Sequence, residues 1–163
     1  MKLSQHGCRS LDQIDTSILR LLASEPRIGA LEISRRLGIA RGTVTARIAR
    51  LEQDGVVTGY GPDIDLATLG YVLTAFVTVE MQSGTYKDLI DKLREIPEVL
   101  ETHVLAGPGD ILCRVVARSN DHLMALLQDI LGSEGVGKTT TAISLSEEIP
   151  PRSLSLVLSA AEG

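Results

Sequence analysis

Aromatic side chains are almost absent from this chain of 163 residues, which has three tyrosines, one phenylalanine and no tryptophan. Hydrophobic residues still make up 44% of the sequence, so any core must be built from aliphatic side chains. No run of about eighteen apolar residues occurs, and the first residues lack the apolar stretch of a secretory signal. We therefore expect neither a membrane span nor export.

Cysteine and histidine are also scarce. Cys8 and Cys113 form no Cys-x-x-Cys pair and indicate no metal site, and so few cysteines fit a reducing, cytoplasmic compartment. His6, His103 and His122 are scattered, and none has a serine or cysteine at an evident nucleophile position. We expect no catalytic set, no metal and no cofactor, and hence no enzyme.

Charge is unevenly distributed along the chain. The net charge is −5, but residues 1–61 carry nine basic and six acidic side chains, whereas residues 62–163 carry seven and fifteen. This contrast suggests two domains with different partners. Because phosphate repels an acidic surface, only the first part is expected to face nucleic acid.

The stretch 41–51, reading RGTVTARIARL, has the spacing of an amphipathic helix. Val44, Ile48 and Leu51 lie at i, i+4 and i+7 and form one apolar stripe. A second short amphipathic helix is predicted over 30–37, and three residues that include a glycine separate the two. This arrangement is typical of a helix-turn-helix, in which the second helix enters the DNA major groove.

Basic residues gather on these two predicted helices. From residue 31 to 51 there are five arginines and a single acidic residue, Glu32. Arginines supply phosphate contacts, and residues near the start of the second helix reach base edges. We expect phosphate contacts from Arg35, Arg36, Arg41 and Arg50, and base contacts from Thr43, Thr45 and Arg47. The alternative is that these side chains form only a solvated helix face.

The order of predicted elements defines five segments. A helix over 11–24, with Asp12 as N-cap and Pro26 beyond its end, completes a three-helix unit. The second half has the order βαββαβ, which is a ferredoxin-like sandwich in an α+β chain. The expected segments are an N-terminal tail (1–10), a helix-turn-helix domain (11–55), a hinge strand at 56–60 with a linker to 70, a ferredoxin-like domain (71–148) and a C-terminal tail (149–163).

The elements of the second half are predicted from composition and turn signals. Strands are expected over 71–81, 99–106, 111–117 and 136–146, and helices over 85–95 and 121–131. The first and last of these strands are more apolar than a half-buried sheet requires, so we expect them to cover a dimer interface. The sequence does not determine the structure of the segment 147–163, for which an edge strand and an irregular tail both stay open.

Five stretches together carry a family pattern: LDQIDTSILRLLASEPRI, LEISRRLGIARGTVTARIARLEQDGVVTGY, LGY, IPEVLETHVLAGPGDILCRVVA and EGVGKTTTAISL. Over about residues 11–148 they resemble the Lrp/AsnC, or feast/famine, transcription regulators. The resemblance implies a winged-type helix-turn-helix, a hinge strand and an αβ sandwich called the RAM domain. It also implies homodimers that often assemble further to octamers, and an amino acid that modulates DNA binding or assembly. Because one small module offers too few contacts to DNA, we expect a dimer on a near-palindromic operator.

The resemblance places the effector at the turn 107–110. A carboxylate there can bind an ammonium group, and open backbone N–H groups can bind a carboxylate. The expected effector residues are Gly107, Pro108, Gly109, Asp110, Thr139 and Thr141. The family usually has threonine where this chain has Ala106 and a Gly-Asp-x-Asp turn, so the changes favour a hydrophobic amino acid. It also has serine where this chain has Ala40, which removes a helix cap.

One motif points elsewhere. Residues 132–139 match the phosphate-binding loop G-x-x-x-x-G-K-[ST]. That loop requires a strand before it and a helix after it, because the helix N-terminus holds the phosphates. Here the predicted order is inverted, so we interpret the glycines as a tight helix-to-strand connection rather than an ATPase site. The main alternative function is a small-molecule-binding enzyme on a ferredoxin-like sandwich, with the helices as a dimerisation unit.

Overall fold

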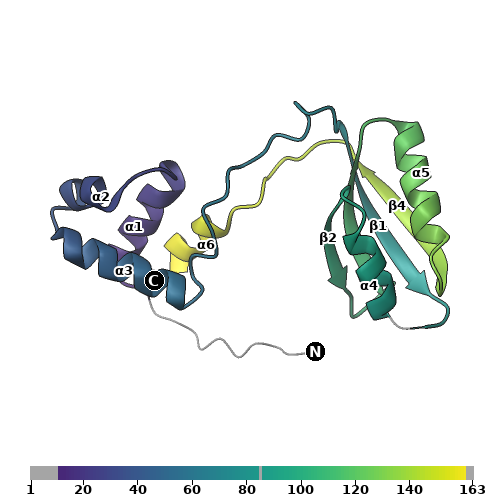
Figure 1. The fold of residues 1–163 in the computed structure, drawn as a ribbon, viewed down its shortest axis with the longest axis horizontal. Coiled ribbons are helices and arrows are strands. Elements are labelled where there is room, and N and C mark those ends of the chain that lie inside the picture. The colour runs from purple at the N-terminus through teal and green to yellow at the C-terminus, as the bar shows by residue number, and fades with distance from the viewer. Residues whose placement is uncertain (1–10, 85, 161–163) are drawn as a thin grey trace. The chain divides into compact units, whose positions relative to one another are not determined.

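The computed structural model describes residues 11–84 and 86–160, so the expected tail 1–10, with His6 and Cys8, lies outside the described residues. The chain divides into two compact units (Figure 1). Residues up to 62 and from 149 onward form one, here called the helical unit. Residues 63–148 form the other, the sheet unit.

The helical unit contains α1 (Gln13–Ser24), α2 (Ala30–Leu37), α3 (Arg41–Gln53) and α6 (Ser153–Ala160). Asp12 begins α1 with a capping box, in which its carboxylate accepts a hydrogen bond from the Asp15 backbone N–H at 2.9 Å. Gly38 ends α2 at a φ of 66°, the left-handed conformation that favours glycine. The buried apolar core is purely aliphatic: Ile18, Ile33, Val44 and Leu51.

The sheet unit contains β1 (Leu73–Met81), α4 (Tyr86–Arg94), β2 (Val99–Val104), β3 (Ile111–Ala117), α5 (Asn120–Leu131) and β4 (Val136–Ser144). The four strands are antiparallel in the order β2-β3-β1-β4, with α4 and α5 packed on one face (Figure 1). This is the ferredoxin-like βαββαβ arrangement that the sequence predicts.

The two faces of the sheet differ. Ala75, Val77 and Val79 of β1 are fully buried in a core that also includes side chains of α4 and α5. The alternate residues of β1 point to the other face, which neither α4 nor α5 covers, and Phe76 there is 41% exposed. We call this second side, made of alternate residues of β1, β3 and β4, the open face.

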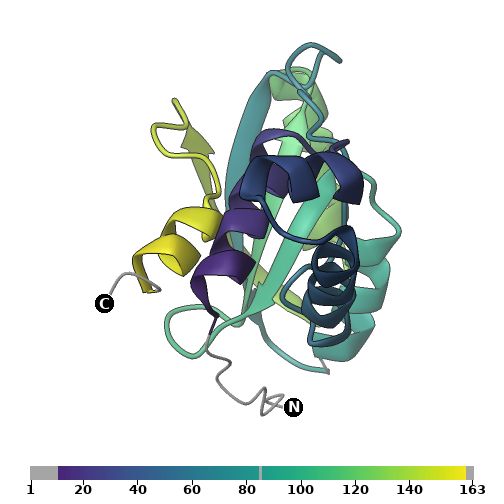
Figure 2. The ribbon, with the colours of Figure 1, turned by 90° about the vertical axis from the view of Figure 1, so that its left-hand side faces the viewer.

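The structure differs from one sequence expectation and answers one question that the sequence left open. The hinge strand expected over 56–60 is absent, because the N–H groups of Val56 and Val57 donate to the Leu51 carbonyl at 2.9 and 3.1 Å and continue the end of α3. Both valines pack on the helical core. The C-terminal segment is neither an edge strand nor wholly irregular, since it forms α6, which contacts α1 (Figure 2).

The inverted context of the loop at 132–139 is confirmed. The loop follows α5 and leads directly into β4, whereas a phosphate-binding loop leads into a helix. Gly135 has a φ of 81°, and a Cβ there would lie 2.2 Å from the Ser83 carbonyl oxygen. Its own carbonyl accepts a hydrogen bond from the Gln82 N–H at 2.8 Å. The glycine therefore permits close packing between two connections of the chain.

Candidate nucleic-acid interface and effector turn

The outer surface of α3 is the side that its core stripe leaves free. Val44 and Leu51 are fully buried, and Ile48 packs beside them. The exposed residues of α3 between positions 41 and 50 are Arg41, Gly42, Thr43, Thr45, Ala46 and Arg50. Ala40, at the N-cap, makes no side-chain hydrogen bond to the N–H groups of the first turn of α3. This surface carries an exposed arginine near each end, Arg41 and Arg50. A basic surface suits binding to the phosphates of DNA.

Arg47 does not belong to this exposed surface, and the expectation that it occupies the solvent-facing side of the helix is wrong. Its side chain is only 23% exposed and points toward α1. Its Nη1 donates to Asp15 Oδ1 at 2.9 Å and also to the Asp12 carboxylate. The Asp15 side chain is 1% exposed. The hydrogen bond from Arg47 is the largest cause that lowers the pKa of Asp12 below its usual value. Arg47 therefore joins α3 to α1.

The other arginines remain at the surface to different degrees. Arg50 Nη2 lies 3.3 Å from Asp15 Oδ2, and half of its side chain is exposed. Arg36 is held by two carboxylates, from Glu25 and Glu32, whereas Arg35 is 70% exposed and 3.8 Å from Glu32. No residue in the described ranges forms an ion pair with Arg41.

The turn at 107–110 connects β2 to β3 and holds the end of β1. Asp110 Oδ2 accepts a hydrogen bond from the Met81 N–H at 2.6 Å, and the Asp110 N–H donates to the Val79 carbonyl at 2.9 Å. Gly109 has a φ of 79°, and a Cβ there would lie 2.2 Å from Thr78 Cγ2. Both Gly109 and Asp110 are therefore needed to seat the turn against β1.

Thr139 and Thr141 lie on β4, which β1 separates from β3. They pair with Val79 and Val77, and so they share the helix-covered face of the sheet. Thr139 lies at the same end of the sheet as the turn, because Val79 also pairs with Ile111. Thr141 is two residues further along the strand. The structure thus places Thr139 and the turn at the same end of the sheet, with β1 and β3 between them.

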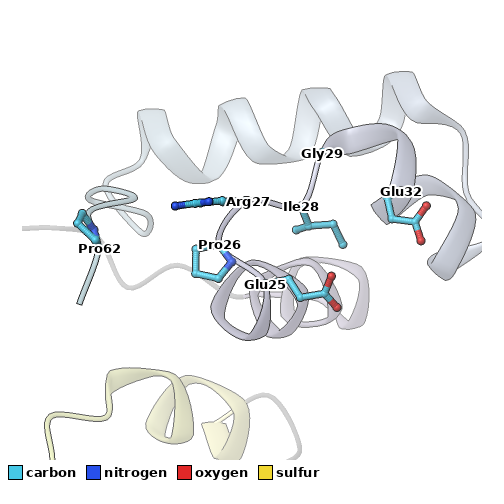
Figure 3. A pocket seen from close by; sticks show the side chains of 7 residues that line it. All are labelled: Glu25, Pro26, Arg27, Ile28, Gly29, Glu32 and Pro62. Carbon is cyan, nitrogen blue, oxygen red and sulfur yellow. The ribbon is translucent and has the colours of Figure 1, made fainter. Parts of the chain in front are cut away.

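An open hollow that sequence reasoning did not identify lies in the helical unit. It has a volume of about 660 Å³ and is lined by Glu25, Pro26, Arg27, Ile28, Gly29, Glu32 and Pro62 (Figure 3). Its only signal in the sequence is the Pro-Arg-Ile-Gly break between α1 and α2. These residues do not include the effector turn.

The histidines and the cysteine of the described residues lie on three different elements, His103 on β2, Cys113 on β3 and His122 on α5. His103 Nε2 lies 3.6 Å from Glu101, and His122 Nε2 lies 3.5 Å from Glu98. Cys113 is buried in β3, and burial raises the pKa of its thiol. Within residues 11–84 and 86–160, no three His, Cys, Asp or Glu side chains gather as a metal site. In the same ranges, no helix has the length and apolar character needed to cross a bilayer.

Family models match both units. Residues 11–58 match the winged helix-turn-helix DNA-binding model, and residues 74–154 match the Lrp/AsnC ligand binding domain. The regulator FL11 of Pyrococcus furiosus is 32% identical over 136 residues, which is 83% of this chain and 89% of that protein. The chain belongs to the Lrp/AsnC family of transcriptional regulators.

Solved structures of this family share its fold. Escherichia coli AsnC superposes with a TM-score of 0.83 at 27% identity, over 90% of this chain and 99% of AsnC. The feast or famine regulatory protein of M. tuberculosis, complexed with L-methionine, has a TM-score of 0.78 at 32% identity, over 88% of this chain and 97% of that one. This Lrp/AsnC chain is therefore a transcriptional regulator with a DNA-binding domain and a ligand-binding domain, and the enzyme alternative is not supported.

Proposed function

We propose that α3 reads operator DNA through Thr43 and Thr45, with Arg35, Arg36, Arg41 and Arg50 on the phosphates. The observation that carries this assignment is the division of the α3 side chains. Thr43, Thr45 and Arg41 are exposed, whereas Arg47 is engaged by two aspartates of the α1 region. Arg47 then acts on DNA indirectly, by fixing how α3 lies on α1.

Substitutions on α3 test this division. The DNA is a duplex selected by the wild-type protein from a random library, compared with an unselected duplex of equal length. Arg41→Ala should weaken binding to both and lower the salt slope by about one phosphate contact. Thr45→Ala should weaken only the selected duplex. The assignment fails if Arg47→Ala keeps its thermal stability but loses discrimination between the two duplexes, since this identifies Arg47 as a base reader.

The proposed effector is an α-amino acid bound at the turn 107–110. Asp110 uses Oδ2 to hold Met81, and no described residue donates to its Oδ1, so that oxygen can accept an ammonium group. The structural relative from M. tuberculosis was solved with L-methionine. Ala106 and Pro108 line this turn without hydroxyl groups, which favours a hydrophobic amino acid. Thr139 and Thr141 could add hydroxyls from β4.

A gel shift with each of the twenty amino acids tests the effector site. Asp110→Ala should abolish the response while ligand-free DNA binding persists. Because this change also removes the bond to Met81, folding is checked by circular dichroism. Glu101→Gln, on β2 in the same unit, is the control. An unchanged response in folded Asp110→Ala protein would place the effector elsewhere.

We further propose that the open face of the sheet forms a homodimer, which can assemble to an octamer. Phe76, Thr78, Thr140 and Ala142 lie on this face and carry no charge, and Arg114, which pairs with Phe76 across the strands, forms an ion pair with Glu101. Two helix-turn-helix units would then bind a near-palindromic operator, in the cytoplasm where the chromosome is accessible. A monomer by light scattering at micromolar concentration, with the fold intact, would contradict this assembly.

A further inference from the structure

The last helix of the chain returns to the first one. α6 belongs to the helical unit and contacts α1, although it follows β4 of the sheet unit in sequence. The connection between β4 and α6, residues 145–152, contains neither helix nor strand and includes Pro150 and Pro151. The family ligand-binding match ends at residue 154, so nearly all of α6 lies beyond it.

The side chains of α6 show how it docks. Leu154, Val157 and Leu158 lie at i, i+3 and i+4, and all three are partly buried, whereas Leu156 points away and is 74% exposed. On α1, Thr16 is only 6% exposed although it lies two residues from Ile18, and so on nearly the opposite side of the helix. The Ile18 side packs in the core with residues of α2 and α3. Because α6 also contacts α1, we infer that it lies on the Thr16 side.

α6 has the properties of an element that can exist in two states. Its eight residues carry no charge and fall short of the roughly 12–15 residues that an isolated helix needs to be stable in water. Its helical form therefore depends on the contact with α1. Docking and helix formation are coupled, and undocking leaves the units joined only by residues 63–72, which also contain no helix or strand.

We propose that α6 is a C-terminal latch that docks on α1 and forms a second tether between the DNA-binding helices and the ligand-binding sheet. α1 holds α3 through Asp15 and Arg47, so the latch lies one helix away from the DNA-reading surface. It also follows β4, which carries the candidate effector residue Thr139. A change at the effector end of the sheet can thus reach the DNA-binding helices through β4 and α6 as well as through the 63–72 linker.

Hydrogen exchange tests the docking without DNA. The variant Leu154→Ser/Leu158→Ser should lose amide protection in α1 around Thr16, with the sheet unit unchanged. Leu156→Ser, on the exposed side of the same helix, is the matched control and should behave as wild type. Equal protection in variant and control would overturn the latch. If circular dichroism shows that the double variant unfolds the helical unit, Leu158→Ala replaces it.

The tether is tested by two changes, made singly and in combination. This test rests on the proposed DNA-binding function. An insertion of Gly/Ser residues between Asp63 and Asp65 lengthens the first tether. With the latch docked, the insertion should barely change affinity for the selected duplex, because the second tether still limits the spacing. With the latch undocked by the Leu154/Leu158 variant, the same insertion should weaken binding several-fold, since a longer single tether lowers the effective concentration of the second DNA-binding unit.

The outcomes separate the two proposals. Non-additive effects support two parallel tethers, whereas additive effects show that α6 only stabilises α1 and overturn the tether. The salt slope should stay constant throughout, because α6 carries no charge and adds no phosphate contact. If the wild-type protein binds no DNA, the proposed function is refuted, while the hydrogen-exchange result on docking still stands.

Discussion

The helical unit and the sheet unit each use an aspartate to hold a functional element, but the two aspartates bind different kinds of group. Asp15 is buried and binds the side chains of Arg47 and Arg50, which come from the recognition helix. Asp110 is exposed and binds the backbone of Met81 at the end of β1. The helical unit thus depends on charge to orient its helices, whereas the sheet unit depends on hydrogen bonds and close packing of its turn.

The largest expected effect is the loss of Asp15. Asp15→Ala leaves Arg47 without its buried partner and should lower the free energy of unfolding of the helical unit by about 3 kcal/mol. Asp91→Ala breaks an exposed ion pair with Arg94 and should cost less than about 1 kcal/mol. Urea unfolding followed by circular dichroism measures both. Equal losses would mean that the buried charge does not set the stability of the helical unit.

Two glycines, one in each unit, allow the packing of the two units to be compared. Gly38 and Gly109 both have positive φ, but a Cβ at Gly38 meets nothing within 4 Å, whereas one at Gly109 collides with Thr78. Gly38→Ala should therefore cost only the left-handed backbone strain, roughly 1–2 kcal/mol. Gly109→Ala should cost more than this and shift β1 against the turn. Thermal unfolding of the two variants gives the difference, and a greater loss for Gly38→Ala would contradict the seating of the turn.

The smallest effect concerns acid. Arg47 lowers the pKa of Asp12, so the folded state favours the carboxylate. That contribution to the free energy of unfolding is fully present above the ordinary aspartate pKa of about 3.9, and it is lost as the pH falls through the lower pKa of the folded state. Unfolding free energies measured between about pH 5 and pH 2 should fall less steeply in Asp12→Asn than in wild type. Parallel curves would show that Asp12 contributes nothing to acid sensitivity.

The sequence predicted the elements well because their signals are local. The 30–37 helix, the Asp12 cap and the β2–β3 hairpin each rest on residues close together in the chain. Arg47 was misplaced because its partners, Asp12 and Asp15, are more than thirty residues away and come from another helix. Charge on a helix face indicates a polar surface, but it does not indicate whether another helix already neutralises it.

The hinge strand was predicted wrongly, and the C-terminal helix was not predicted, for related reasons. Val56 and Val57 are β-branched and favour a strand, yet the nearby Leu51 carbonyl accepts their N–H groups. α6 consists of leucine, valine, serine and alanine, which carry weak helix signals in so short a segment. Its partner, α1, lies at the opposite end of the sequence, so periodicity alone could not identify the helix.

The position of Phe76 on the open face suits a fluorescent probe. It is the single phenylalanine of the chain, which has no tryptophan, and it lies in the middle of the uncovered side of the sheet. Phe76→Trp would introduce the only indole fluorophore in the molecule at that position. Its emission would shift to shorter wavelength when another surface excludes water from the sheet. The scarcity of aromatic residues thus makes one substitution a specific fluorescent reporter of assembly.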